Sequence, residues 1–141
     1  MDVDSIHPRL LEDCHHVGSL PSGIVLLHRN AALHWFILVP DSILQDVLDL
    51  PPADAQRVFT DCAAVSAYIK QGLSYPKVNF GGLGNQVPQM HLHIIGRRTG
   101  DACWPDPVWG NLQYSGVYNT EKLQSIRSGL TESAGLVPAQ D

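Results

Sequence analysis

One long amphipathic segment, with short apolar runs on both sides of it, most constrains how this chain can fold. The segment "LPPADAQRVFTDCAAVSAYIKQGL", residues 50–73, opens on two prolines and closes near Gly72, as helices commonly do. Its apolar positions recur every three or four residues, at Ala55, Val58, Phe59, Cys62, Val65 and Ile69. This spacing predicts one main helix with a single buried face, which another layer of structure must cover.

Short apolar runs precede and follow this helix. "GIVLLHR" (23–29) and "HWFILVP" (34–40) come before it, whereas "YPKVNF" (75–80) and "QMHLHIIGR" (89–97) come after it. Strands joined by short loops pair antiparallel. The order therefore predicts an α+β fold, an antiparallel sheet of about five strands with a main helix and a C-terminal helix, in a single domain over residues 1–141.

The two ends of the chain complete this prediction. "HPRLLED" suits a short helix opened by Pro8. The C-terminal helix is expected from Asn119 or Thr120 to about Thr131, and residues 134–141 are expected to fray.

Composition narrows the class of partner and the compartment. Apolar residues make up 44% and charged residues 16% of the 141 residues, which argues against disorder. The net charge of −5 argues against a nucleic acid or an anionic membrane as the main partner. No apolar run approaches the ~18 residues of a membrane span, and the acidic start "MDVDSIHPRLLEDCHH" does not resemble a signal peptide. With three widely spaced cysteines read as reduced thiols, we expect a cytoplasmic protein.

The stretch "QMHLHIIGR" places polar and apolar residues in strict alternation. On a strand, Gln89, His91 and His93 would share one face, while the apolar residues between them would face the core. The loop before it, "NFGGLGNQVP", contains three glycines, whose backbone N–H groups can approach phosphate oxygens closely. Asn85 and Gln86 add side-chain donors. A phosphate-binding loop that runs into two imidazoles predicts a site for phosphate chemistry.

This combination resembles the histidine triad (HIT) superfamily, whose signature is His-x-His-x-His followed by two apolar residues. The resemblance covers about residues 23–98. It implies a small α+β domain, commonly a homodimer, that binds a small nucleotide and in many members cleaves a phosphoanhydride or phosphoramidate bond at the α-phosphate. It implies neither a cofactor nor a metal.

The resemblance also implies roles for individual residues. His91 matches the nucleophile and His93 the histidine that helps to hold the phosphate, whereas Gln89 stands where the family has its first histidine. Trp35 stands where relatives often have another histidine. The nucleotide and its phosphates are expected to contact Asn30, which falls near the ribose-binding position, and Asn79, Gly82, Gly84, Asn85 and Gln86.

The chemistry of a neutral imidazole supports the role of His91. It is nucleophilic near pH 7, and attack on phosphorus would give a phospho-histidine intermediate that water hydrolyses. A glutamine at position 89 can orient groups but cannot pass a proton. The sequence therefore predicts a preference for leaving groups that need no proton, such as polyphosphates, over amines.

Two other readings stay open at this stage. The H-x-H pattern also suits a metal site, with a third ligand from His15, His16, His28, His34, Asp101 or Cys103. The loss of the first histidine also suits a nucleotide-binding module without turnover. In the loop "CWPDPVWG", Trp104 and Trp109 are expected to pack on the core or to form a dimer contact, with a cover over the site as the alternative.

Overall fold

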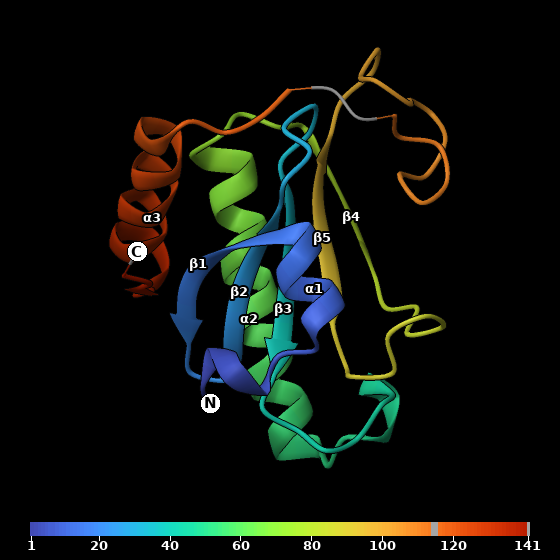
Figure 1. The fold of residues 1–141 in the computed structure, drawn as a ribbon, viewed down its shortest axis with the longest axis vertical. Coiled ribbons are helices and arrows are strands. Elements are labelled where there is room, and N and C mark those ends of the chain that lie inside the picture. The colour runs from blue at the N-terminus through green and yellow to red at the C-terminus, as the bar shows by residue number, and fades with distance from the viewer. Residues whose placement is uncertain (114–115, 141) are drawn as a thin grey trace.

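The computed structural model describes residues 1–113 and 116–140 (Figure 1). It contains one six-stranded antiparallel sheet in the order β4-β5-β3-β2-β1-β6. The α+β prediction is confirmed, with six strands where about five were expected. The strands are β1 (Cys14–Leu20), β2 (Gly23–His28), β3 (Trp35–Pro40), β4 (Lys77–Gly81), β5 (Leu92–Arg97) and β6 (Val137–Pro138).

Three α-helices and two short 3-10 helices complete the fold. They are η1 (Val3–Ser5), α1 (Pro8–Asp13), η2 (Val47–Asp49), α2 (Pro52–Gln71) and α3 (Thr120–Ala134). The three predicted helices are present, and α3 begins behind Asn119, whose side chain accepts a hydrogen bond from the backbone of Lys122 at 2.8 Å. Among the described residues, no helix is both long enough and apolar enough to cross a membrane.

Two strands were not predicted. β1 contains only one β-branched residue, Val17, and its pairing with β2 is interrupted by a register shift between His16 and Gly18. The tail expected to fray instead supplies β6, which pairs with Gly18 and Ser19 of β1. β1 forms a hairpin with β2 although its own sequence lacks an apolar, β-branched run, whereas β6 depends on a partner far away in the chain, which local propensity does not encode.

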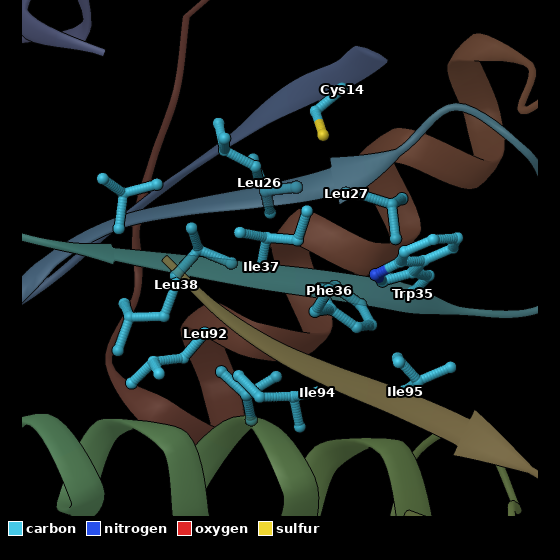
Figure 2. Close-up of a cluster of buried hydrophobic side chains, with 14 of the residues drawn as sticks. Cys14, Leu26, Leu27, Trp35, Phe36, Ile37, Leu38, Leu92, Ile94 and Ile95 are labelled. Carbon is cyan, nitrogen blue, oxygen red and sulfur yellow. The ribbon is translucent and has the colours of Figure 1, made fainter. Parts of the chain in front are cut away.

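The two faces of the sheet have different neighbours. Phe36 of β3 and Ile94 of β5 are paired in register on the face that packs against α2, where the Phe36 ring meets Tyr68 edge to face at 6.3 Å. Figure 2 shows Ile94 directed at α2, in green, with Cys14 on the other side of the sheet. His93 and Ile37, which are paired on β5 and β3, face that other side, which α1 partly covers.

The main helix buries most of the predicted face. Tyr68, which the predicted set did not include, is also buried, and two further positions differ. Phe59 is exposed and packs on the Phe80 ring of β4 at 5.9 Å. Asp61, which the apolar pattern did not include, is buried and accepts hydrogen bonds from the backbone (2.8 Å) and hydroxyl (2.5 Å) of Ser22. Asp61 therefore ties α2 to the turn between β1 and β2.

Candidate active site

A cavity of about 350 Å³ opens on the sheet face opposite α2, the face that carries His93 and Ile37. The cavity is lined by α1, by Cys14 at the start of β1, by residues of β2 and β3, by the glycine loop, by the histidine stretch and by the loop after β5. Of the predicted site residues, His91, His93, Gly84, Asn85 and Gln86 lie on its wall. The structure thus brings together the two histidines and three of the six predicted nucleotide-binding residues.

His91 lies just before β5 and is 9% exposed. Its Nδ1 lies 2.7 Å from the backbone oxygen of Gln89. Because a carbonyl oxygen can only accept, Nδ1 must carry the hydrogen. The neutral ring then presents an unprotonated Nε2, which is the form that a nucleophilic imidazole requires.

His93 has the opposite arrangement. The indole Nε1–H of Trp35, which can only donate, points at Nδ1 of His93 across 2.9 Å. Nδ1 therefore accepts, and Nε2 carries the hydrogen. Burial, followed by the neighbouring His91 and His28, lowers the pKa of His93 to about 3, so its ring is a neutral hydrogen-bond donor near pH 7.

Aromatic contacts hold these rings in place. His28 stacks on Trp35 with centroids 4.2 Å apart and planes inclined by 8°. The Nδ1 atom of His28 accepts from the backbone of Asn30 at 3.1 Å. His91 and Trp109 each meet the His93 ring edge to face, at 5.1 and 5.2 Å. Trp35, noted in the sequence only as a replacement for a histidine, thus orients His93.

The glycine loop contributes only in part. Gly84 lies on the cavity wall with a φ of 69°, a conformation that side chains with a Cβ rarely adopt. Gly82 instead lines a neighbouring hollow beneath η2, together with Met90 and Leu92. Gly82 therefore does not line the cavity that contains His93.

The two predicted asparagines lie away from the cavity wall. Asn30 is buried, with Oδ1 accepting from Ala32 at 3.1 Å and Nδ2 donating to the Gln113 oxygen at 2.8 Å. The Oδ1 atom of Asn79 accepts from Arg97 at 2.8 Å. In this geometry both side chains stabilise loops, and their predicted contacts with a nucleotide stay a prediction.

Gln89 also differs from its expected placement beside the histidines. β5 begins only at Leu92, so the strict alternation does not extend back to Gln89. Its side chain instead bonds to the N-terminal segment, with Oε1 accepting from the His7 backbone at 2.7 Å and Nε2 donating to the Ser5 oxygen at 3.0 Å. Gln89 is not on the cavity wall.

A buried ion pair orders the loop after β5. The Arg97 and Asp101 side chains are 1% and 3% exposed, with Nε and Oδ2 2.8 Å apart and Nη2 and Oδ1 3.1 Å apart. Burial acts to raise the pKa of Asp101, but hydrogen bonds from Arg97 and from the backbone of Arg98 and Cys103 lower it to about 2. No local sequence signal pointed to this pair, because an i, i+4 spacing brings side chains together on a helix and Arg97 ends a strand.

The same loop places the two tryptophans differently. Trp109 lies on the cavity wall, whereas Trp104 is 37% exposed, with the Arg97 guanidinium 5.5 Å from its ring. The expected packing of Trp109 on the core is confirmed, since its partly buried side chain packs against the core cluster and also lines the cavity, while a dimer contact stays a prediction. Residues 114 and 115 lie outside the described chain.

The metal alternative has no complete set of donors. Within residues 1–113 and 116–140, no three histidine, cysteine, aspartate or glutamate side chains come close enough together to hold a metal ion. His15, His16 and Cys103, which were candidate third ligands, are absent from the cavity wall. His28 and Asp13 are on it, but they form no such group with the two histidines.

Comparisons with known proteins identify the family and agree with the fold. The sequence profile of the HIT domain matches residues 11–100. A histidine triad protein from Bradyrhizobium japonicum is 38% identical, with 92% of this chain and 96% of that one covered and a TM-score of 0.84. One from Marinobacter aquaeolei is 35% identical, with 94% and 98% covered and a TM-score of 0.85.

A curated relative adds a more distant likeness. The bis(5'-nucleosyl)-tetraphosphatase (asymmetrical) of Schizosaccharomyces pombe is 28% identical over 82 residues, which span 55% of this chain and 45% of that protein. The chain thus matches less than half the length of this relative. The profile match and the similarity to solved structures over nearly the whole chain establish that the chain belongs to the histidine triad (HIT) family.

Proposed function

We propose that this protein cleaves a phosphoanhydride bond at the α-phosphate of a nucleotide, with His91 as the nucleophile. The observation that carries the proposal is the pair of opposite tautomers in one cavity. His91 offers an unprotonated Nε2, and His93 offers an Nε2–H. The likeness to a tetraphosphatase supports a dinucleoside polyphosphate as the substrate.

The reaction follows from these two forms. Nε2 of His91 attacks the α-phosphorus, the bond from phosphorus to the bridging oxygen breaks, and the leaving group departs with the electron pair. The phospho-histidine is then attacked by water, which forms a new P–O bond, returns the electron pair to Nε2 and releases its proton to solvent. In this mechanism the phosphoryl oxygens are stabilised by the Nε2–H of His93 and by backbone N–H groups near Gly84, since both residues line the cavity.

The experiment compares two single-histidine variants. His91→Ala should lose roughly 1000-fold or more in kcat on diadenosine tetraphosphate, because covalent catalysis is removed. His16→Ala, which removes a histidine outside the cavity, should retain activity and serves as the control. Rapid-quench mass spectrometry should detect a nucleotidyl adduct on His91 of the wild type. Turnover by His91→Ala close to the wild-type rate would disprove the proposal.

Binding measurements distinguish an enzyme from the second alternative, a nucleotide-binding module without turnover. If the wild type binds the dinucleotide but neither turns it over nor forms the adduct, the protein is a nucleotide-binding module. The homodimer and the cytoplasmic location implied at the sequence level stay predictions, and light scattering tests the first of them.

A further inference from the structure

The residue in place of the first triad histidine connects two distant parts of the chain. Gln89 uses both ends of its amide on the backbone of the N-terminal segment, at Ser5 and His7. These positions lie just before α1, which begins at Pro8. The Nδ1 atom of His7 then accepts from the backbone of Arg9 at 3.1 Å and caps the helix. Gln89 therefore determines where α1 starts relative to the histidine stretch.

The helix that is held in this way forms part of the cavity wall. Arg9, Leu10 and Asp13 of α1 all line the cavity that contains His91 and His93. Leu10 is buried in the core and gives the helix a second point of attachment. The amide of Gln89 and the side chain of Leu10 together place Arg9 at the cavity.

Among the described residues that line the cavity, Arg9 is the only lysine or arginine. Its side chain is exposed, and it forms no hydrogen bond or ion pair with another described residue. Asp13, four residues on, lines the cavity without an ion pair to it. A guanidinium presents several donors in a fork that matches phosphate oxygens. Arg9 is therefore available to an anionic ligand.

We propose that Arg9 binds the polyphosphate leaving group of the substrate and that Gln89 is the positioning residue that places it there. The inference rests on the function proposed above and names the part of the substrate that sets specificity. A polyphosphate leaves as an anion and needs charge neutralisation rather than a proton. With glutamine in place of the first histidine, the site lacks a proton donor at that position. Gln89 instead holds the Arg9 guanidinium, a cation, at the cavity.

The kinetic test uses two substrates with the same nucleotide half. Diadenosine tetraphosphate has an anionic phosphate leaving group, whereas the p-nitrophenyl ester of AMP has a leaving group without phosphate. Arg9→Gln should lower kcat/KM at least roughly tenfold on the first and change it by no more than about twofold on the second. Arg57→Gln, which removes an exposed arginine paired with Asp54 outside the cavity, should leave both values unchanged. Equal losses on both substrates for Arg9→Gln would overturn the inference.

A second readout does not depend on turnover. By calorimetry, Arg9→Gln should weaken binding of adenosine 5'-tetraphosphate roughly tenfold, with the affinity for AMP unchanged. Failure of the wild type to turn over either substrate would reject the proposed function alone. Equal effects of Arg9→Gln on the two ligands, or none, would reject this inference whether or not the protein is an enzyme.

The positioning role of Gln89 is tested by selectivity. Gln89→Ala should reduce the ratio of kcat/KM values, polyphosphate over aryl ester, in the same direction as Arg9→Gln. In the double variant the ratio should fall no further than in Arg9→Gln, because both changes remove one interaction. Gln89→Glu keeps the acceptor for His7 but loses the donor to Ser5, so its ratio should be intermediate. If Gln89 had a purely structural role, Gln89→Ala would lower kcat/KM by the same factor for both substrates and leave their ratio unchanged.

Discussion

The loop after β5 and the segment before β1 both contribute to the wall of one cavity, yet different interactions hold them. The loop is ordered by the Arg97–Asp101 ion pair, which is almost fully buried and hydrogen-bonded at both ends. The N-terminal segment is held by the packing of Leu10 in the core and by the neutral amide of Gln89, which makes two bonds to backbone groups at the partly exposed edge of the protein.

The two contacts differ in how much stability the protein loses when each of them is removed. Removing one member of a buried ion pair leaves an uncompensated charge in a medium of low polarity. Removing an amide at a partly exposed edge lets water replace most of the lost hydrogen bonds. We therefore expect the loop wall to open only with the whole domain, and the N-terminal wall to open by itself.

The largest effect is expected on the loop wall. Asp101→Ala should lower the free energy of unfolding by about 3–5 kcal/mol, because Arg97 is left buried without its partner. Asp54→Ala, which breaks the exposed Arg57–Asp54 pair, should change it by less than about 1 kcal/mol. Urea denaturation at neutral pH measures both, and similar small losses for the two variants would contradict the comparison.

The ring of His93, against which Trp109 of the loop wall packs, gives the next effect. Its pKa is lowered from 6.5 to about 3, first by burial and then by His91 and His28. Below pH 6.5 the unfolded chain takes up a proton that the folded chain does not. This contribution to stability is therefore complete above pH 6.5 and is lost as the pH falls toward 3.

Between pH 7.5 and 5, this one group should lower the free energy of unfolding by roughly 2 kcal/mol. The free energy of unfolding of His93→Gln should fall correspondingly less between pH 7.5 and 5. His34, whose pKa is lowered to about 4 mainly by burial, titrates in the same window in both proteins and cancels in the difference. Parallel curves of unfolding free energy against pH would show that His93 is not shielded from water.

A smaller effect is expected on the N-terminal wall. Gln89→Ala should lower the free energy of unfolding by about 1–2 kcal/mol, through the loss of two hydrogen bonds. Amide exchange by NMR should show faster exchange at His7, with protection at core positions such as Ile94 reduced only by the global loss. Exchange that rises equally at both positions would mean that this wall does not open independently.

The smallest effect compares one glycine from each side of the cavity. Gly84 and Gly110 both have positive φ, of 69° and 77°, and a Cβ at either would meet no atom closer than 3.8 Å. Alanine at either position should therefore cost only backbone strain, about 1 kcal/mol. A much larger loss for Gly110→Ala would show that the loop wall resists change beyond its ion pair. Thermal denaturation of the two variants makes the comparison.

Much of the fold follows from local patterns. The helical period between residues 50 and 73 and the cap at Asn119 locate α2 and the start of α3, which continues to Ala134, three residues past the expected end. β2, β3 and most of β5 follow from apolar and β-branched runs. β1 could not be located in this way because its run is polar at His15, His16 and Ser19, and β6 could not because it pairs with a strand near the opposite end of the chain.

In the candidate site, too, local sequence predicts some features, whereas others depend on residues far apart in the chain. Adjacent residues in "QMHLHIIGR" are enough to predict that His91 and His93 occupy one site, because a strand alternates its faces over short distances. The tautomer of each ring depends on its partner, however, and the partner of His93 is Trp35, 58 positions away. Gln89 finds its partners 82 and 84 positions away, at His7 and Ser5.

The sequence by itself therefore determined the α+β class, the main helices and the pair of histidines, since short-range periodicity and stereochemistry encode each of them. Only the tertiary structure decided which side chain sets the tautomer of His93, that Gln89 turns to the N-terminal segment, and that Arg9 and Trp109 reach the cavity. The physical reason is that hydrogen bonds and ring contacts act over a few ångströms in space, and folding brings together residues that are far apart in the chain.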